Sequence, residues 1–212
     1  MAAPLLDAVN RVLGPMLPGS ALRSVLTTLE IAPNAEVGSL DLVSTRRVLD
    51  QLSVGLKLYT GRIGRAQLDQ LKIALTGSLH PPPTRLTLEV NGESDVLLSV
   101  KACQRLCKGF FSATDCVRLA TVVSELSRNI YMYAKRGLVV LELAEDNRGV
   151  QLTIVASDEG PGFVVDDVMA RTYVSKTGLG RGLKGCRDIL DSMTVESAPG
   201  RTVIVGSKRV RQ

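Results

Sequence analysis

The stretch SELSRNIY at residues 124–131 decides how the C-terminal part of this chain is interpreted. It places Glu125 and Asn129 four residues apart, so both side chains point the same way from a helix. A carboxylate there can accept a proton from an attacking hydroxyl or water, and an amide oxygen is a hard ligand that suits Mg²⁺ beside phosphates. A solvated helix face can carry the same pair, so its meaning depends on the motifs that follow.

The helix that carries this pair is predicted to begin at Ser112. Ser112 and Asp115 have the spacing of a capping box, in which each side chain bonds the other residue's backbone amide. Apolar residues continue the helical stripe towards Arg136, about six turns at the usual pitch. The next two apolar segments, 138–144 and 150–157, flank a polar turn and predict a β-hairpin.

A second cluster follows the hairpin, where Asp158 comes directly after the apolar strand and precedes Gly160 and Gly162. A partly buried carboxylate at a sheet edge can accept a hydrogen bond from the amino group of adenine. The two glycines let the backbone turn sharply and approach a flat ring closely. An ordinary Asp-Glu-Gly turn is the alternative interpretation of this cluster on its own.

A third cluster, GLGRG at residues 178–182, precedes a helix predicted over about 182–190. Its glycines place bare backbone amides at a helix start, where unpaired N–H groups and the helix dipole stabilise anions. Lys176 and Arg181 lie close enough in sequence to offset phosphate charge, and each is equally consistent with a surface loop. The cluster is not a Walker A sequence, because no Gly-Lys-Ser/Thr closes it, and no strand runs directly into it as in a dinucleotide fingerprint.

A proline-rich connector, GSLHPPP at residues 77–83, divides the chain, because no helix can continue through it. Residues 1–76 carry helical patterns over 20–31, 42–59 and 68–75. They predict a small all-α helical bundle, which we expect to serve dimerisation or partner docking.

Residues 84–212 change pattern and are predicted to form the second domain. A strand over 85–90 and a helix over 95–108 precede the long helix, and two strands over 193–197 and 202–207 end the domain. Hairpin-connected strands with helices gathered to one side predict an α+β fold, a two-layer α/β sandwich rather than a doubly wound sheet.

The composition is that of an ordinary globular protein, with 45% hydrophobic and 22% charged residues. Aromatic residues are only 3% and the net charge of +5 is spread along the chain, so we expect no nucleic acid partner. No signal pattern or long apolar stretch is present, which predicts a soluble cytoplasmic protein without membrane contact. The four cysteines are expected to be reduced and mostly buried rather than to bind zinc.

The three clusters together, Glu125-x-x-x-Asn129, Asp158-x-Gly160-x-Gly162 and Gly178-x-Gly180-x-Gly182, resemble a known set of motifs. They are similar to the N, G1 and G2 boxes of the GHKL ATP-binding fold, which gyrase B, Hsp90, histidine kinases and MutL share. Within this superfamily, residues 124–131 and the stretch SDEGPG at 157–162 closely resemble bacterial anti-sigma regulatory factors and RsbT-type switch serine/threonine kinases. The likeness covers residues 84–209.

This resemblance implies that the chain uses ATP and Mg²⁺. It implies that Glu125 is the catalytic base, that Asn129 binds Mg²⁺ and that Asp158 holds the adenine. The remaining nucleotide-binding residues implied by it are Gly160, Gly162, Gly178, Leu179, Gly180, Arg181, Gly182 and Thr202. Closeness in sequence to the phosphate-binding turn adds Lys176 to this set. At Thr202 the sequence departs from the family, because it reads PGRT where the family often has adjacent Gly-Thr.

The expected function is that of a serine/threonine kinase of the anti-sigma or switch type. The resemblance implies a STAS-domain antagonist protein as substrate, in a partner-switching pathway that controls a sigma factor or another regulator. The only histidine, His80, lies in the proline connector and is a poor phosphoacceptor, which disfavours a histidine kinase. The 15 residues of 163–177 leave room for a short lid over the nucleotide.

Two other functions remain open from the sequence. A nucleotide-sensing module would sequester a partner without significant phosphotransfer. A DNA reader would use Arg46 and Arg47 of the N-terminal helices, although neither a helix-turn-helix pattern nor a concentration of basic residues accompanies them.

Overall fold

The computed structural model describes residues 4–13, 19–32, 34–59, 64–169 and 179–211. The chain divides into two compact units. The first contains residues 1–84 and 144–146, and the second contains residues 85–143 and 147–212.

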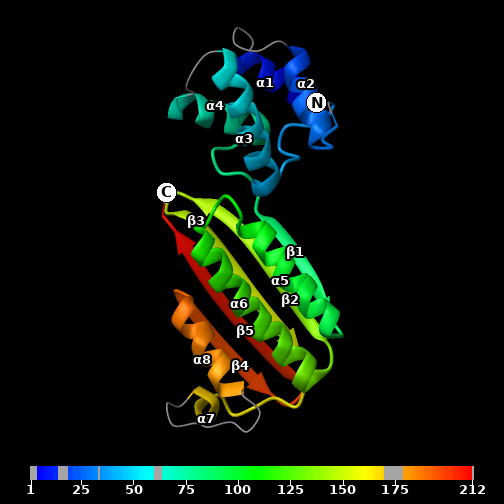
Figure 1. Cartoon of the computed structure of the whole chain (residues 1–212), viewed down its shortest axis with the longest axis vertical. Coiled ribbons are helices and arrows are strands. Elements are labelled where there is room, and N and C mark those ends of the chain that lie inside the picture. Colours follow the sequence, from blue (N-terminus) through cyan, green and yellow to red (C-terminus); the bar gives the residue numbers. More distant parts are fainter. Residues whose placement is uncertain (1–3, 14–18, 33, 60–63, 170–178, 212) are drawn as a thin grey trace. The chain divides into compact units, whose positions relative to one another are not determined.

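The first unit is built of helices (Figure 1). These are α1 (Leu5–Leu13), α2 (Gly19–Thr28), α3 (Leu42–Tyr59) and α4 (Arg65–Thr76). The three helices predicted from the sequence are confirmed to within one turn at each end. Aliphatic side chains from all four pack into one core, formed by Leu5, Val9, Leu13, Leu26, Leu40, Val48, Leu49, Leu52, Leu71 and Leu75.

Helix α1 was not predicted, although its sequence carries a signal for it. Leu5, Val9 and Leu13 recur every four residues, and all three are buried. A helix of nine residues is marginal by itself in water, so its stability must come from this packing. The pattern becomes decisive only once the other helices supply a core.

The second unit contains a five-stranded sheet within the described residues, in the order β1-β2-β3-β5-β4. Strand β5 pairs antiparallel with both β3 and β4, and two turn residues join β2 to β3 in the predicted hairpin. The strand bounds are β1 (Thr84–Val90), β2 (Gly137–Asp146), β3 (Gly149–Asp158), β4 (Ser192–Ala198) and β5 (Arg201–Val210).

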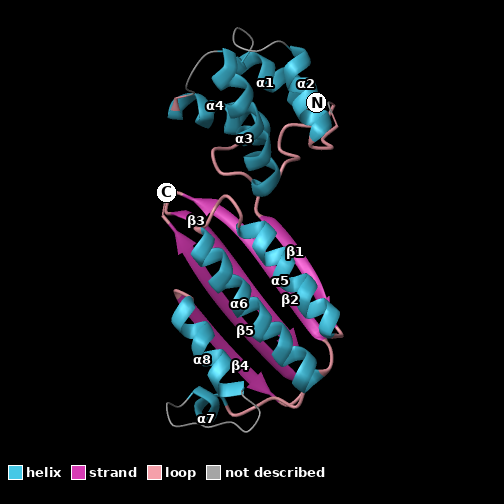
Figure 2. Cartoon of the chain, in the orientation of Figure 1, coloured by secondary structure: helices cyan, strands magenta, loops and turns pink. Residues whose placement is uncertain are grey.

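Helices cover one face of this sheet (Figure 2). They are α5 (Glu93–Cys107), α6 (Ala113–Asn129) and α8 (Leu179–Ile189), with the short α7 (Val165–Met169) beside α8. In β3, Leu152, Ile154 and Ala156 alternate with less buried residues, as expected of a strand with one covered face. The prediction of a two-layer α+β sandwich is therefore confirmed. None of the helices in the described ranges combines the length and the apolar character needed to cross a membrane.

Helix α6 begins as predicted but ends differently. Ser112 Oγ accepts a hydrogen bond from the Asp115 amide at 3.1 Å, and it also donates to Asp115 Oδ2 at 2.7 Å. The α-helix ends at Asn129, earlier than the prediction of Arg136, and continues as a π-helical turn over Ile130–Ala134. Lys135 then adopts a left-handed φ of 70°, which ends the helix. Such π turns are frequent at functional sites, because they shift side chains relative to a regular helix.

The described part of helix α8 starts at Leu179, about one turn before the predicted start near Gly182. Gly180 and Gly182 lie inside the first turn rather than ahead of it. Glycine costs about 1 kcal/mol in a helix, and the burial of Leu183 and Cys186 from the same helix offsets that cost. The first-turn N–H groups still lack partners within the helix, so the reason for expecting an anion at this end is unchanged.

Candidate functional site

A cavity of about 70 Å³ lies between the end of α6 and the sheet. One wall comes from α6 and the π turn, and the other comes from β3, β5 and the loop after β3. Its lining residues are Leu126, Asn129, Ile130, Tyr133, Ala156, Asp158, Pro161, Gly162, Phe163, Thr202 and Ile204. The lining is therefore mostly apolar with a few polar groups, which is the composition of a small-molecule site.

Asp158 is the last residue of β3 and lies opposite Thr202 in the β3–β5 pairing. Its Oδ1 accepts a hydrogen bond from the Gly160 amide at 2.9 Å. Burial raises the pKa of the Asp158 carboxyl, and the Gly160 hydrogen bond opposes that shift. The carboxylate can thus accept a further donor from a ligand in the cavity.

The raised pKa of Asp158 predicts a pH dependence of nucleotide binding. We expect the affinity for ADP to fall as the pH is lowered through this pKa, because a protonated carboxyl loses acceptor capacity. The fall should begin at a higher pH than an ordinary aspartic acid would give. It should be absent in Asp158→Asn, and calorimetric titration of ADP over a series of pH values measures both proteins.

The effect of pH on the stability of the free protein has the opposite sign to its effect on nucleotide affinity. Because burial raises the pKa of Asp158, its ionised form costs stability in the free protein at neutral pH. That cost is relieved as the pH falls through the raised pKa. An unfolding midpoint that tracked nucleotide affinity downwards would therefore point to another titrating group.

The glycines after Asp158 are required by close packing. A Cβ on Gly160 would lie 2.7 Å from the Cβ of Ala134 in the π turn. Gly162 has a φ of +70°, and a Cβ there would lie 2.5 Å from the carbonyl carbon of Ala198. The loop can approach the π turn and β4 only because both residues lack a side chain.

We expect Gly162→Ala to lower the free energy of unfolding more than Gly200→Ala does. Gly200 also has a positive φ, +81°, but a Cβ there meets no described atom within 4 Å. Both variants bear the left-handed backbone cost of about 1–2 kcal/mol, and Gly162→Ala adds overpacking of about 1–3 kcal/mol. Denaturant unfolding measures both, and equal losses would contradict the close contact with Ala198.

Hydrogen bonds tie the loop to the adjacent strands. Phe163 N donates to Ser197 Oγ at 3.0 Å, and Ser197 Oγ lies 3.0 Å from Thr202 Oγ1. Gly200 N donates to Gly160 O at 2.8 Å. These bonds hold Asp158, Thr202 and the glycine loop together at one end of the sheet.

Asn129 and Glu125 leave α6 on the same side but meet different surroundings. Asn129 lines the cavity, and its amide nitrogen is buried without a hydrogen-bond partner among the described residues. A buried amide with an unused donor fits a site that a polar ligand completes. Glu125 is outside the cavity lining, and its carboxylate lies against Gly182 in the first turn of α8.

The structure thus brings most of the predicted residues to one end of the second unit. Asn129, Asp158, Gly162 and Thr202 share the cavity, while Gly160 packs behind it. Two predicted residues, Lys176 and Gly178, lie outside the described residues, as do the side chains of Leu179 and Arg181. The backbone of residues 179–182 forms the first turn of α8.

Comparison with known proteins assigns the family of this chain. Residues 114–211 match the family described as histidine kinase-, DNA gyrase B-, and HSP90-like ATPase. The serine/threonine-protein kinase RsbT of Bacillus subtilis (strain 168) is 37% identical over 91 residues, which cover 42% of this chain and 68% of RsbT. The chain belongs to the GHKL ATPases, in the RsbT-type serine/threonine kinase branch. The resemblance seen in the three sequence motifs is thereby confirmed.

The apolar walls of the cavity in this GHKL chain were not predicted. Leu126, Ile130 and Tyr133 share a helical face with Asn129, so the i, i+3, i+4, i+7 spacing from Leu126 was an available signal. Phe163 could also have been expected in the lining, because it directly follows Gly162 of the second motif. Ile204 and Ser197 come from other strands, and only the β5 pairings bring them to the site.

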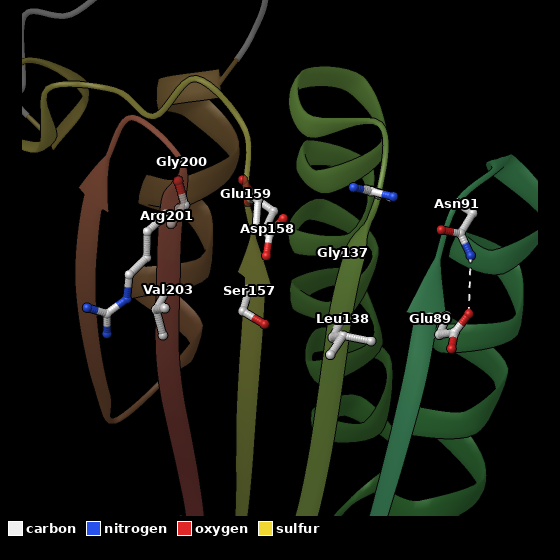
Figure 3. Close-up of a pocket in the computed structure, with 12 residues that line it drawn as sticks. Glu89, Asn91, Gly137, Leu138, Ser157, Asp158, Glu159, Gly200, Arg201 and Val203 are labelled. Atoms are coloured by element: carbon white, nitrogen blue, oxygen red, sulfur yellow. Dashed lines mark hydrogen bonds between the residues drawn. The ribbon is translucent and has the colours of Figure 1, made fainter.

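A larger cavity, about 680 Å³, opens on the other face of the sheet and shares Asp158 and Thr202 with the first. Figure 3 shows Glu89, Leu138, Ser157 and Val203 lining it from neighbouring strands. Asn129 and Gly162 do not line it. The smaller cavity is therefore the better candidate for the adenine site in this GHKL chain, because it combines Asp158 with Asn129 and Gly162.

Proposed function

We propose that this protein transfers the γ-phosphate of ATP to a serine or threonine of a STAS-domain antagonist protein, within a bacterial partner-switching pathway. The observation that carries the proposal is the placement of Asn129 and Asp158 in one cavity, with Glu125 one helical turn away beside the first turn of α8. This arrangement provides a site for the adenine ring, a site for the phosphates and a carboxylate that can accept a proton. RsbT is itself a serine/threonine-protein kinase, which supports the reaction type.

In this proposal, Asp158 accepts a hydrogen bond from the adenine amino group while it keeps the bond from Gly160. The apolar side chains of Ile130 and Ile204 cover the ring. The first-turn N–H groups of α8, residues 179–182, bind the phosphates, and Lys176 and Arg181 offset their charge. Asn129 supplies a ligand to Mg²⁺, which when bound neutralises phosphate charge.

Glu125 acts as the base in the transfer step. The substrate hydroxyl oxygen forms a bond to the γ-phosphorus, and the bond from that phosphorus to the β,γ-bridging oxygen breaks, releasing ADP. The hydroxyl proton passes to the Glu125 carboxylate. In this class of reaction, catalysis comes mainly from positioning and charge neutralisation, so the chain needs few reactive groups.

The test uses the full chain with ATP, Mg²⁺ and a STAS-domain protein encoded beside it. We expect a phosphoserine or phosphothreonine on the STAS protein, identified by mass spectrometry. Nucleotide binding without transfer to any such partner would contradict the kinase proposal and favour a module that sequesters its partner. Transfer to a protein of another fold would retain the kinase and reject the STAS substrate.

A further inference from the structure

Glu125 is held against α8 at a position where only glycine fits. A Cβ added to Gly182 would come closer to Glu125 Oε2 than van der Waals contact allows, and would lie 3.3 Å from its Cδ and 3.7 Å from its Cγ. The end of the glutamate side chain therefore packs on bare helix backbone. The motif resemblance gives Gly182 a role towards phosphate and says nothing of this contact.

Helix α8 offers a fixed surface for this contact. Leu183 and Cys186, on either side of the next turn, are buried, and α8 packs on α6. Cys186 Sγ lies 4.0 Å from Val122 O of α6. The pKa of Cys186 is raised to about 12, first by burial and then by the charge of Glu125.

We propose that Gly182 is a positioning residue, whose missing side chain lets the first turn of α8 hold the Glu125 carboxylate in its reactive position. This inference rests on the proposed role of Glu125 as the base. Packing against the helix restricts the rotamers of a flexible side chain. Gly182 thus links the position of the phosphate-binding helix to the position of Glu125, the proposed general base.

Gly182→Ala tests the role of this contact. The added methyl group meets the far end of a side chain rather than backbone, so the fold should persist while Glu125 moves away. We expect kcat for phosphotransfer to fall about tenfold or more, because small displacements of a catalytic group have large effects on rate. The dissociation constant for ADP, measured beside kcat, reports separately any effect on the phosphate contacts of the same turn.

Gly185→Ala is the matched control on the same helix. A Cβ at Gly185 meets no described atom within 4 Å, and this residue is exposed. Both variants gain the helix propensity of alanine, so helix propensity does not separate them. They differ in the contact with Glu125 and in the place of Gly182 in the phosphate-binding turn, which the double-mutant cycle below distinguishes. An equal loss of kcat in both variants would overturn the proposal.

A double-mutant cycle with Glu125→Asp separates positioning from phosphate binding. The shorter aspartate should no longer reach Gly182, so Gly182→Ala should have little further effect on kcat in that background. A fall of the same factor in both backgrounds would show that Gly182 acts independently of Glu125, and would overturn the proposal.

A readout without catalysis distinguishes failure of this inference from failure of the kinase proposal. The carboxyl ¹³C resonance of Glu125, assigned by its loss in Glu125→Gln, should shift in Gly182→Ala and remain in place in Gly185→Ala. An unmoved resonance in Gly182→Ala overturns the role of Gly182, whatever the activity. A wild-type chain that transfers no phosphate overturns the proposed function instead.

Discussion

Glu125→Gln is expected to slow phosphotransfer by about 100- to 10,000-fold, the usual contribution of a general base. Glutamine keeps the size of the side chain and its approach to Gly182, but it cannot accept the proton of the substrate hydroxyl. Affinity for ATP should stay within about twofold of the wild type, because Glu125 is outside the lining of the base cavity. Single-turnover transfer at saturating ATP, with calorimetry for binding, separates the two quantities.

The matched control for this variant is Asp188→Asn. Asp188 is an exposed acid on α8, the helix against which Glu125 packs, and it lies outside the cavity lining. The Asp188→Asn variant should keep the wild-type rate of phosphotransfer and the wild-type affinity for ATP. If Glu125→Gln transferred phosphate at the wild-type rate, Glu125 would not be the base, and positioning alone would have to account for catalysis.

The polar parts of the site could be predicted because each belongs to a short local pattern. Asn129 follows Glu125 by one helical turn, and Asp158 ends a strand whose alternation is evident from the sequence. In such segments, the period of the local structure decides which side chains share a face. The same reasoning gave the hairpin and the layer of helices over the sheet.

The remaining features depend on contacts between distant segments. Neither the π turn before Lys135 nor the start of α8 at Leu179 has a distinctive local pattern, because packing in the second unit decides them. From the sequence, Gly182 was expected to present a backbone amide to an anion. Its contact with Glu125 was not expected, because the two residues are 57 positions apart in the sequence. A one-dimensional pattern shows that a glycine is present but not which side chain occupies the space.

Asp158→Asn is expected to weaken binding of ATP and ADP by roughly 10- to 150-fold, since a hydrogen bond to a charged group contributes about 1.5–3 kcal/mol. Asp158 has two carboxylate oxygens, and Oδ1 is already used by the Gly160 amide at 2.9 Å. The other oxygen remains for the adenine amino group. Asparagine has one acceptor oxygen, so its NH₂ group must face one of the two donors.

Glu159→Gln is the control for this variant, because it changes an adjacent acid that is exposed and absent from the smaller cavity. Calorimetry with ADP compares the three proteins, and a GTP titration tests whether the lost energy belongs to adenine. We expect Asp158→Asn to narrow the preference for ADP over guanine nucleotides, because the carboxylate selects an amino donor at that position of the ring. An unchanged ADP affinity in Asp158→Asn would show that Asp158 does not hold the adenine amino group.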